Sequence, residues 1–191
     1  AKDNVFGKVG GSVSLGGNLM NRQRSGISSS SGELLVPNLF SLNNGVNSPS
    51  VSQSFSQKKI NSAYALLQLN YDGYLFVDLT GRNDWTSTLS KANRSFFYKS
   101  ASTSLVISDM ITKNGGDLPS WFTFGKIRGS YAEVGNDLGA YQLRNSFSIG
   151  NDPLGNTTAG TNSVLLNPDV VNELIKSVEI GLEARFLNNR V

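Results

Sequence analysis

The 191-residue sequence contains neither cysteine nor histidine. Without cysteine there can be no disulfide framework and no thiolate chemistry, and without histidine the usual zinc sites and imidazole-based catalytic triads are excluded. No apolar run approaches the ~20 residues of a membrane-spanning helix, and residues 1–7 lack the charged and apolar regions of a signal peptide. An enzyme is therefore not expected, and any passage through a membrane must use strands.

The charge of the chain is nearly balanced. Seventeen basic and 14 acidic residues are spread along the sequence and give a net charge of +3, so a nucleic-acid-binding surface is not indicated. Only 38% of the residues are hydrophobic, while glycine is abundant, with 20 residues. This composition favours strands and turns over helices.

The strongest pattern is a period-two alternation near the C-terminus. From Leu174 to Phe186 one set of alternate residues is mainly apolar and the other mainly polar or charged. The apolar set is Leu174, Lys176, Val178, Ile180, Leu182, Ala184 and Phe186, and the other is Ile175, Ser177, Glu179, Gly181, Glu183 and Arg185. Strands of a transmembrane barrel alternate in this way, because every second side chain faces lipid.

Similar alternation predicts about six strands in all. The other five run over Val5–Leu15, Ala63–Tyr71, Tyr74–Arg82, Phe97–Ile107 and Phe124–Val134. Asp72-Gly73 is a strong two-residue hairpin signal, since glycine tolerates positive φ. The sequence therefore predicts an all-β, antiparallel, up-and-down arrangement.

The connections between these strands alternate between long and short. Long ones are expected at Gly17–Lys58, Asn83–Ser95 and Gly135–Asn172, and shorter ones at Asp72-Gly73, Ser108–Thr123 and Asn188-Asn189. Outer-membrane barrels have long extracellular loops and short periplasmic turns. A soluble β-sandwich would also show alternating strands, but structureless loops beyond ~12–15 residues are uncommon in compact domains.

Several runs of the sequence carry distinctive motifs. They are Tyr74–Ser90, which contains Gly81-Arg82-Asn83-Asp84-Trp85, then Asn93–Tyr98, Trp121–Asp137, Leu166–Asp169 and Ser177–Arg190. These runs resemble the barrel of SusC-like, TonB-dependent outer-membrane transporters. The first two are similar to a family strand that closes at the extracellular rim and to the start of the returning strand, the third to a strand followed by Gly-Asn, and the last two to the family's C-terminal elements.

This resemblance implies that residues 1–191 are part of a transmembrane β-barrel of about 22 strands in the Gram-negative outer membrane of Bacteroidetes-type bacteria. The family's plug, N-terminal extension, TonB-binding segment and final strand have no counterpart here. The implied protein imports oligosaccharides or oligopeptides with a SusD-like surface lipoprotein and TonB, and needs no cofactor. The alternative is a non-transporting β-rich adhesin or glycan-binding module, which would be soluble without detergent.

Eight residues are candidates for the barrel lumen or its rim: Arg82, Asp84, Trp85, Lys126, Arg128, Glu179, Glu183 and Arg185. Charged groups and a tryptophan at positions 82–85 could bind a ligand, or they could hold a rim loop. The others could pair with the plug or with neighbouring strands. Glu179 and Glu183 lie about 13 Å apart along one strand, which exceeds the roughly 5–9.5 Å used in glycoside hydrolysis.

Overall fold

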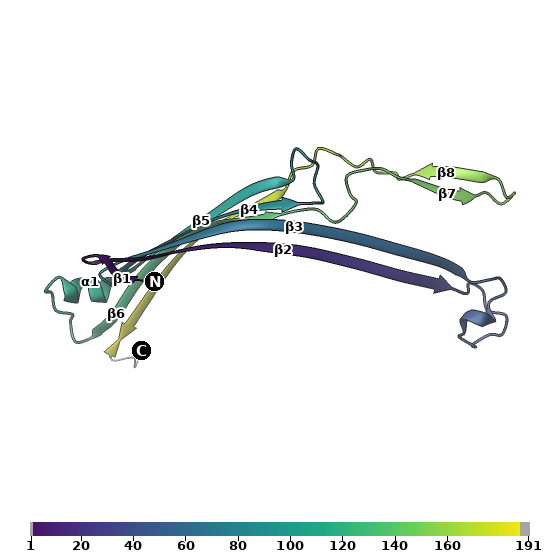
Figure 1. Cartoon of the computed structure of the whole chain (residues 1–191). Helices are drawn as coiled ribbons and strands as arrows, with labels where there is room; N and C mark the ends of the chain where they lie inside the picture. Colours follow the sequence, from purple (N-terminus) through teal and green to yellow (C-terminus); the bar gives the residue numbers. More distant parts are fainter. Residues whose placement is uncertain (1, 188–191) are drawn as a thin grey trace.

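The computed structural model of the protein describes residues 2–187, and antiparallel strands make up most of that range (Figure 1). The strands of the main sheet are β1 (Lys2–Phe6), β2 (Val9–Ser30), β3 (Ser50–Tyr71), β4 (Leu75–Thr86), β5 (Ser95–Val106), β6 (Phe122–Asn136) and β9 (Glu173–Phe186). A separate hairpin consists of β7 (Phe147–Asn151) and β8 (Thr157–Thr161). The helical elements are η1 (Leu42–Asn44) and α1 (Ile107–Lys113). No helix in the described range is long and apolar enough to cross a membrane.

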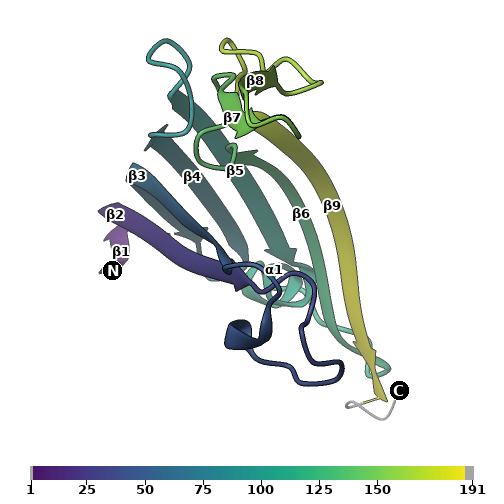
Figure 2. The same ribbon diagram turned by 90° about the vertical axis from the view of Figure 1, so that its right-hand side faces the viewer.

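The main sheet is an open, curled wall. Its order is β1-β2-β3-β4-β5-β6-β9, with each strand antiparallel to its neighbour. Figure 2 shows the sheet curling between β2 and β9. Among the described residues only Leu89, Phe96 and Val106 are buried hydrophobic residues. The predicted all-β up-and-down fold is confirmed, and it is a segment of wall without a closed core.

The strand register separates the side chains into two faces. We call inner the face of one polar row across the sheet, which consists of Ser12, Gln68, Asp78, Ser102, Ser130 and Glu179. The adjacent row on the outer face consists of Val13, Leu67, Leu79, Ala101, Tyr131 and Val178. The two residue sets predicted for β9 lie on these opposite faces, and Ile180 on the outer face is 86% exposed.

The apolar region of the outer face is inclined to the strands. Toward the end that carries η1, the outer-face residue just before the first Asn, Lys or Glu of each strand is, in sheet order, Leu19, Ala63, Gly81, Ala101, Tyr131 and Val178. When the register projects these residues onto β2, the boundary moves from Leu19 to Val13. It therefore shifts by six residues between the first strand and the sixth, which are five strand spacings apart. At ~3.3 Å per residue and ~4.8 Å per strand this corresponds to a tilt of about 40°, as in transmembrane barrels.

The short connections gather at one end of the wall. Asp72 and Gly73 both have positive φ, of 49° and 68°, which fits the predicted tight turn. The Asp72 carboxylate lies 2.8 Å from the Lys8 ammonium in the β1–β2 turn and 3.9 Å from that of Lys113 in α1. The hydrogen bond from Lys8 lowers the pKa of Asp72. Figure 1 places η1 and the β7–β8 hairpin at the opposite end, so the connections alternate between the two ends of the wall as predicted. Their lengths do not alternate as predicted, because the β4–β5 connection, residues 87–94, is shorter than the β5–β6 connection, residues 107–121.

The predicted loop Gly17–Lys58 is wrong over most of its length. β2 and β3 continue through it as two paired 22-residue strands, and only residues 31–49 connect them. The pairing of the two backbones does not require apolar side chains, and beyond the wall both faces are open to water. The alternation that identifies a half-buried strand is therefore lost, although the strands persist.

Four other boundaries differ from the predictions. Gly7, with φ of 59°, turns the chain between β1 and β2, so Val5–Leu15 is not one strand. The connection predicted at Asn83–Ser95 is shorter, because β4 continues to Thr86. The β7–β8 hairpin occupies part of Gly135–Asn172, and α1 occupies part of Ser108–Thr123. Side-chain periodicity is weak or absent in the extensions and the hairpin, so it did not indicate them. The predicted turn Asn188-Asn189 lies outside the described residues.

Substitution of Ile180 by arginine in the intact barrel tests the assignment of the outer face. Ile180→Arg is expected to destabilise the assembled barrel by about 2–4 kcal/mol, because it places a charge in hydrocarbon. Ser177→Arg, on the inner face of the same strand, is expected to cost much less. Urea unfolding of the barrel in lipid vesicles measures both values. Equal costs at the two positions would contradict the assignment.

Candidate functional site on the inner face

A shallow hollow of about 650 Å³ lies across the wall from β2 to β6. We call it the inner-wall hollow, and its inner-face lining includes Ser14, Asn18, Tyr64, Arg82, Tyr98 and Ala132. Because one concavity is lined from strands that are not neighbours, the inner face is the concave face of the sheet. The hollow therefore opens toward the barrel interior.

Two tyrosines and an arginine lie side by side in this hollow. Tyr64 of β3, Arg82 of β4 and Tyr98 of β5 are paired in register, and Gly16 of β2 completes their row. A Cβ atom on Gly16 would lie 2.4 Å from the Tyr64 ring, so the ring covers this glycine closely. The Arg82 guanidinium carbon lies 5.9 Å from the Tyr98 ring centroid. The row offers aromatic surface and hydrogen-bond donors to a molecule in the lumen.

Asp84 fixes Arg82 at the extracellular end of the hollow. Arg82 Nε donates to Asp84 Oδ1 at 2.8 Å, and Arg82 Nη2 donates to Ser62 Oγ at 3.1 Å. The Tyr98 hydroxyl donates to Asp84 Oδ2 at 2.8 Å. Asp84 is only 6% exposed. The predicted residues Arg82 and Asp84 are thus brought together in a rim network, and the charge of Arg82 is balanced within it.

Trp85 does not join this network. It follows Asp84 on β4 and pairs with Asn61 and Ser95, so strand alternation places it on the outer face. Its exposure is 42%. The candidate site of Arg82, Asp84 and Trp85 therefore needs correction: neighbouring strands supply Tyr64 and Tyr98 as the inner-face aromatics. A single sequence cannot reveal these cross-strand partners, because the register that joins them is a long-range property.

Further toward the periplasmic end, the inner face carries a chain of hydrogen bonds across four strands. Ser12 Oγ donates to Gln68 Oε1 at 3.2 Å, and Gln68 Nε2 donates to Asp78 Oδ1 at 3.1 Å. Ser102 Oγ donates to Asp78 Oδ2 at 3.3 Å. These hydrogen bonds hold the four polar side chains in fixed positions across the inner face.

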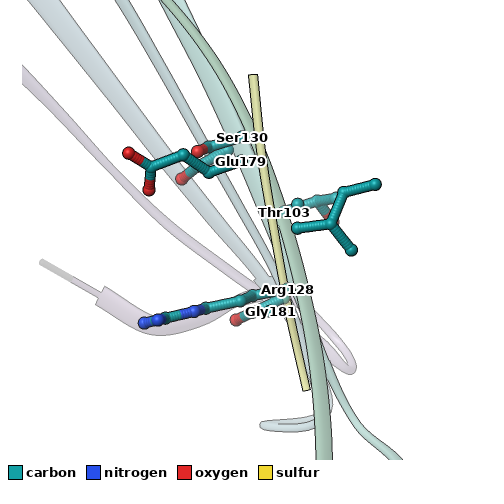
Figure 3. A pocket seen from close by; sticks show the side chains of 9 residues that line it. Thr103, Arg128, Ser130, Glu179 and Gly181 are labelled. Atoms are coloured by element: carbon teal, nitrogen blue, oxygen red, sulfur yellow. The ribbon is translucent and has the colours of Figure 1, made fainter. Parts of the chain in front are cut away.

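The candidates Arg128 and Glu179 lie in a smaller pocket between β5, β6 and β9. Figure 3 shows their side chains, with Ser130, on one side of the sheet, while Thr103 points to the other. Arg128 passes directly over Gly181, where a Cβ atom would lie 2.4 Å from Arg128 Nε. Glycine at position 181 therefore leaves room for the arginine to lie along the wall.

The remaining candidates lie lower on β6 and β9. Lys126 stands opposite Glu183 in the register. The Glu183 carboxylate accepts from Arg185 Nη2 at 2.8 Å, and Arg185 also lies 4.9 Å from the Phe124 ring centroid. Neighbouring strands thus bring these charges together on the inner face. No group of three or more acidic side chains within residues 2–187 is placed to hold a metal ion.

The most buried polar cluster is one that the sequence does not indicate, and we call it the Asp137 latch. The Asp137 carboxylate accepts from Lys58 of β3 and from Thr86 and Thr88, and Thr88 Oγ1 lies 2.8 Å away. Thr86 and Thr88 are 2% and 3% exposed. Burial raises the pKa of Asp137, but hydrogen bonds from Lys58, Thr86 and Thr88 outweigh this effect and leave the pKa lowered. The latch joins the base of the β2–β3 hairpin to two loops.

Asp137 is not among the sequence candidates, because an Asn-Asp pair after a strand is ordinary turn chemistry. Asn93 makes a second hydrogen bond between loops at the same rim: its Nδ2 donates to the Asp169 carbonyl at 3.0 Å. The Thr-Ser-Thr run at positions 86–88, so close to the Arg82–Asp84 pair, is the one local signal of a polar cluster. Its acidic partner lies 49 residues beyond Thr88 and is found only through the fold.

Known proteins are similar to this chain in sequence and in fold. The sequence is 30% identical over 146 residues to the TonB-dependent receptor P26 of Formosa agariphila, an alignment that covers 74% of this chain and 14% of that receptor. The RagAB peptide transporter structure matches 97% of the chain with a TM-score of 0.80 at 20% identity. The chain matches a barrel portion of a TonB-dependent receptor of the SusC/RagA type. No protein-family model matches the sequence.

The TonB-dependent receptor segment covers only part of its relatives, 14% of the Formosa receptor and 21% of the RagAB chain. The "open-open" state of the RagAB peptide importer matches similarly, with a TM-score of 0.77 and 22% identity over 97% of this chain and 20% of that one. Such receptors reside in the Gram-negative outer membrane, which is the location of this segment. They are transporters and not enzymes, as the sequence led us to expect.

Replacement of Asp137 by asparagine in the intact receptor tests the latch. Asp137→Asn leaves Lys58, whose side chain is only 22% exposed, without its carboxylate partner, so opening of the β2–β3 hairpin base should become easier by about 1–3 kcal/mol. Limited proteolysis of the receptor in vesicles measures this as faster cleavage between residues 23 and 56. Lys59→Met, at the neighbouring lysine on the outer face, is the control and should cleave at the unmodified rate. Unchanged cleavage in Asp137→Asn would contradict the latch.

The same latch has a defined pH dependence. Because the pKa of Asp137 is lowered from its ordinary value of 3.8, its stabilising effect is complete above that value and disappears as the pH falls through the lowered pKa. Protection of the hairpin should therefore stay constant between pH 7 and about pH 5 and fall only below the ordinary range of aspartate. Hydrogen exchange at several pH values measures it. Asp137→Asn should lack this acid transition, and a transition of equal size in that variant would assign it to another group.

Proposed function

We propose that this chain supplies wall strands and extracellular hairpins to an outer-membrane importer of oligopeptides or oligosaccharides. In this proposal a SusD-like surface lipoprotein delivers the nutrient, and TonB energises its passage through the barrel. The observation that carries the proposal is the two-faced wall: an apolar outer face inclined at the angle of a transmembrane barrel, backed by a concave inner face with a polar and aromatic hollow.

The inner-wall hollow supports an oligomeric nutrient. Tyr64 is 42% exposed and gives a flat apolar surface, and the amide or hydroxyl groups of a peptide or sugar could bond to nearby polar side chains such as Ser14 and Asn18. Because the charge of Arg82 is balanced by Asp84, Arg82 can orient a ligand but adds no net charge to the hollow. Such a surface suits weak, repeated contacts along a moving chain, because no single group holds the ligand strongly.

The β2–β3 hairpin supports a partner at the cell surface. Its tip is ordered, since the Asn44 side chain donates to the carbonyls of Val36 and Leu39 and accepts from the Val36 amide. The tip also exposes apolar side chains, among them Phe40 at 87% and Leu35 at 70%. An ordered apolar projection on the extracellular side is suited to contact with a second protein. The similar RagAB structure is that of a peptide importer.

Uptake by cells that carry the intact transporter tests the function. Deletion of its gene should abolish uptake of a fluorescent oligopeptide or oligosaccharide, and the wild-type gene should restore it. Tyr64→Ala should raise the half-saturating concentration roughly tenfold if the ring contributes about 1.4 kcal/mol of contact. Tyr131→Ala, which removes a tyrosine from the outer face, is the matched control and should leave uptake unchanged. Normal uptake in the deletion strain, with loss of adhesion to glycans instead, would favour an adhesin.

A further inference from the structure

Arg22 and Arg24 stand on the inner face of the β2–β3 hairpin, beyond the inner-wall hollow. Both lie on β2 in alternation with Ser12, Ser14 and Asn18, and both are exposed. Their Cα atoms are about 7 Å apart along the strand. Among the side chains of residues 7–187 neither guanidinium takes part in an ion pair. Two unpaired cations therefore project from one face of the hairpin.

Lys58 shows where this face points. It stands directly opposite Arg22 in the register, so the two side chains leave the hairpin on the same side. The Lys58 ammonium bonds to the Asp137 carboxylate and lies 3.2 Å from the Leu138 carbonyl oxygen, in the connection that follows β6. β6 is three strands further round the curled sheet. The face that carries Arg22 and Arg24 therefore looks across the mouth of the barrel segment, and not toward lipid.

The charge of this hairpin is not balanced by its own residues. Between Val9 and Tyr71 the sequence has one acidic residue, Glu33, against four basic ones, Arg22, Arg24, Lys58 and Lys59. Glu33 lies at the far tip. Like charges directly opposite each other are unfavourable, and the Asp137 carboxylate relieves the repulsion between Lys58 and Arg22. The inner face keeps the positive charge of both arginines.

The position of the arginines connects them to the hollow. Arg22 lies four residues beyond Asn18, which lines the inner-wall hollow, and this is about 13 Å along β2. A cation at the mouth of a concave wall raises the local concentration of anions and speeds their encounter. Arginine also binds carboxylates through two parallel hydrogen bonds, which a lysine cannot form.

We propose that Arg22 and Arg24 form a carboxylate-binding station at the mouth, which selects anionic oligomers over neutral ones before they reach the inner-wall hollow. The ligand class is a chain that bears several carboxylates, either an acidic oligopeptide or an oligosaccharide of uronic acids. This inference rests on the proposed import function and narrows its substrate. Capture by Arg22 and Arg24 and passage over Tyr64 and Arg82 are then successive steps.

Binding to the purified full-length transporter tests the station directly. Four fluorescent probes are compared by anisotropy: oligoglutamate, oligoglutamine, oligogalacturonate and oligogalactose. The double variant Arg22→Gln/Arg24→Gln should bind its anionic probe roughly tenfold more weakly at low salt, and the difference should shrink toward 0.5 M salt, at which charges beyond about 4–5 Å are screened. Binding of the neutral probes should not change. The two anionic arms distinguish a peptide from a sugar substrate.

Lys59→Gln is the matched control. Lys59 adjoins Lys58 but lies on the opposite face of β3, so its loss removes one positive charge from the same hairpin without touching the mouth. Its anionic binding should equal that of the wild type, and electrophoretic mobility with and without heating verifies that each barrel is assembled. Equal weakening by Lys59→Gln, or undiminished anionic binding by the double variant, would overturn the station.

Uptake by cells separates this inference from the proposed function. Both proposals are supported if wild-type cells import an anionic probe in preference to its neutral counterpart and cells with the double variant import the two equally. Import of every probe with no such preference refutes the station and leaves the importer. Failure of wild-type cells to import any oligomer refutes the importer, while the anisotropy measurement still decides whether Arg22 and Arg24 bind carboxylates.

Discussion

The structure depends on one requirement, that every backbone N–H and C=O group of a strand in hydrocarbon must be bonded to a neighbouring strand. Between β2 and β9 the wall meets it with antiparallel ladders, while among the described residues β9 is paired on one edge only and the outer edge of β2 is paired only at its start, with β1. With the backbone groups bonded in this way, the polarity of the side chains determines which medium each face contacts. Hydrocarbon contacts one face and a polar interior contacts the other, so the chemistry of the protein is confined to alternate residues.

Charge on the inner face is managed by pairing within the wall. Arg82 with Asp84, Arg185 with Glu183, and Lys58 with Asp137 each bring opposite charges together, and all three pairs lie on the concave side or at its rim. Pairing costs little where lumen water still reaches the groups, and it keeps the wall from repelling or trapping a passing ligand. Lys126 and Arg128 make no ion pair among the described residues either, but Lys126 stands opposite Glu183 and Arg128 shares a pocket with Glu179. Arg22 and Arg24 differ from them because the hairpin strands carry no acidic residue.

The extracellular rim is the best-packed part of the segment. Thr86, Thr88, Leu89 and Asp84 are all at most 6% exposed, whereas most of the wall offers both faces to its surroundings. The Asp137 latch lies in this region, so the base of the long hairpin is anchored by buried hydrogen bonds although its outer half is exposed. The latch therefore fixes where the long hairpin leaves the wall.

The sequence alone was enough to predict the strands whose two faces meet different media, such as Leu174–Phe186, together with the Asp72-Gly73 turn and the parity of the connections. Local alternation records these features directly. It did not predict the outer halves of β2 and β3, where water on both faces removes the alternation. Nor did it predict the partners of Asp137, Tyr64 or Arg22. Those depend on strand register and on the curl of the sheet, and only the tertiary structure brings residues distant in the chain to one face.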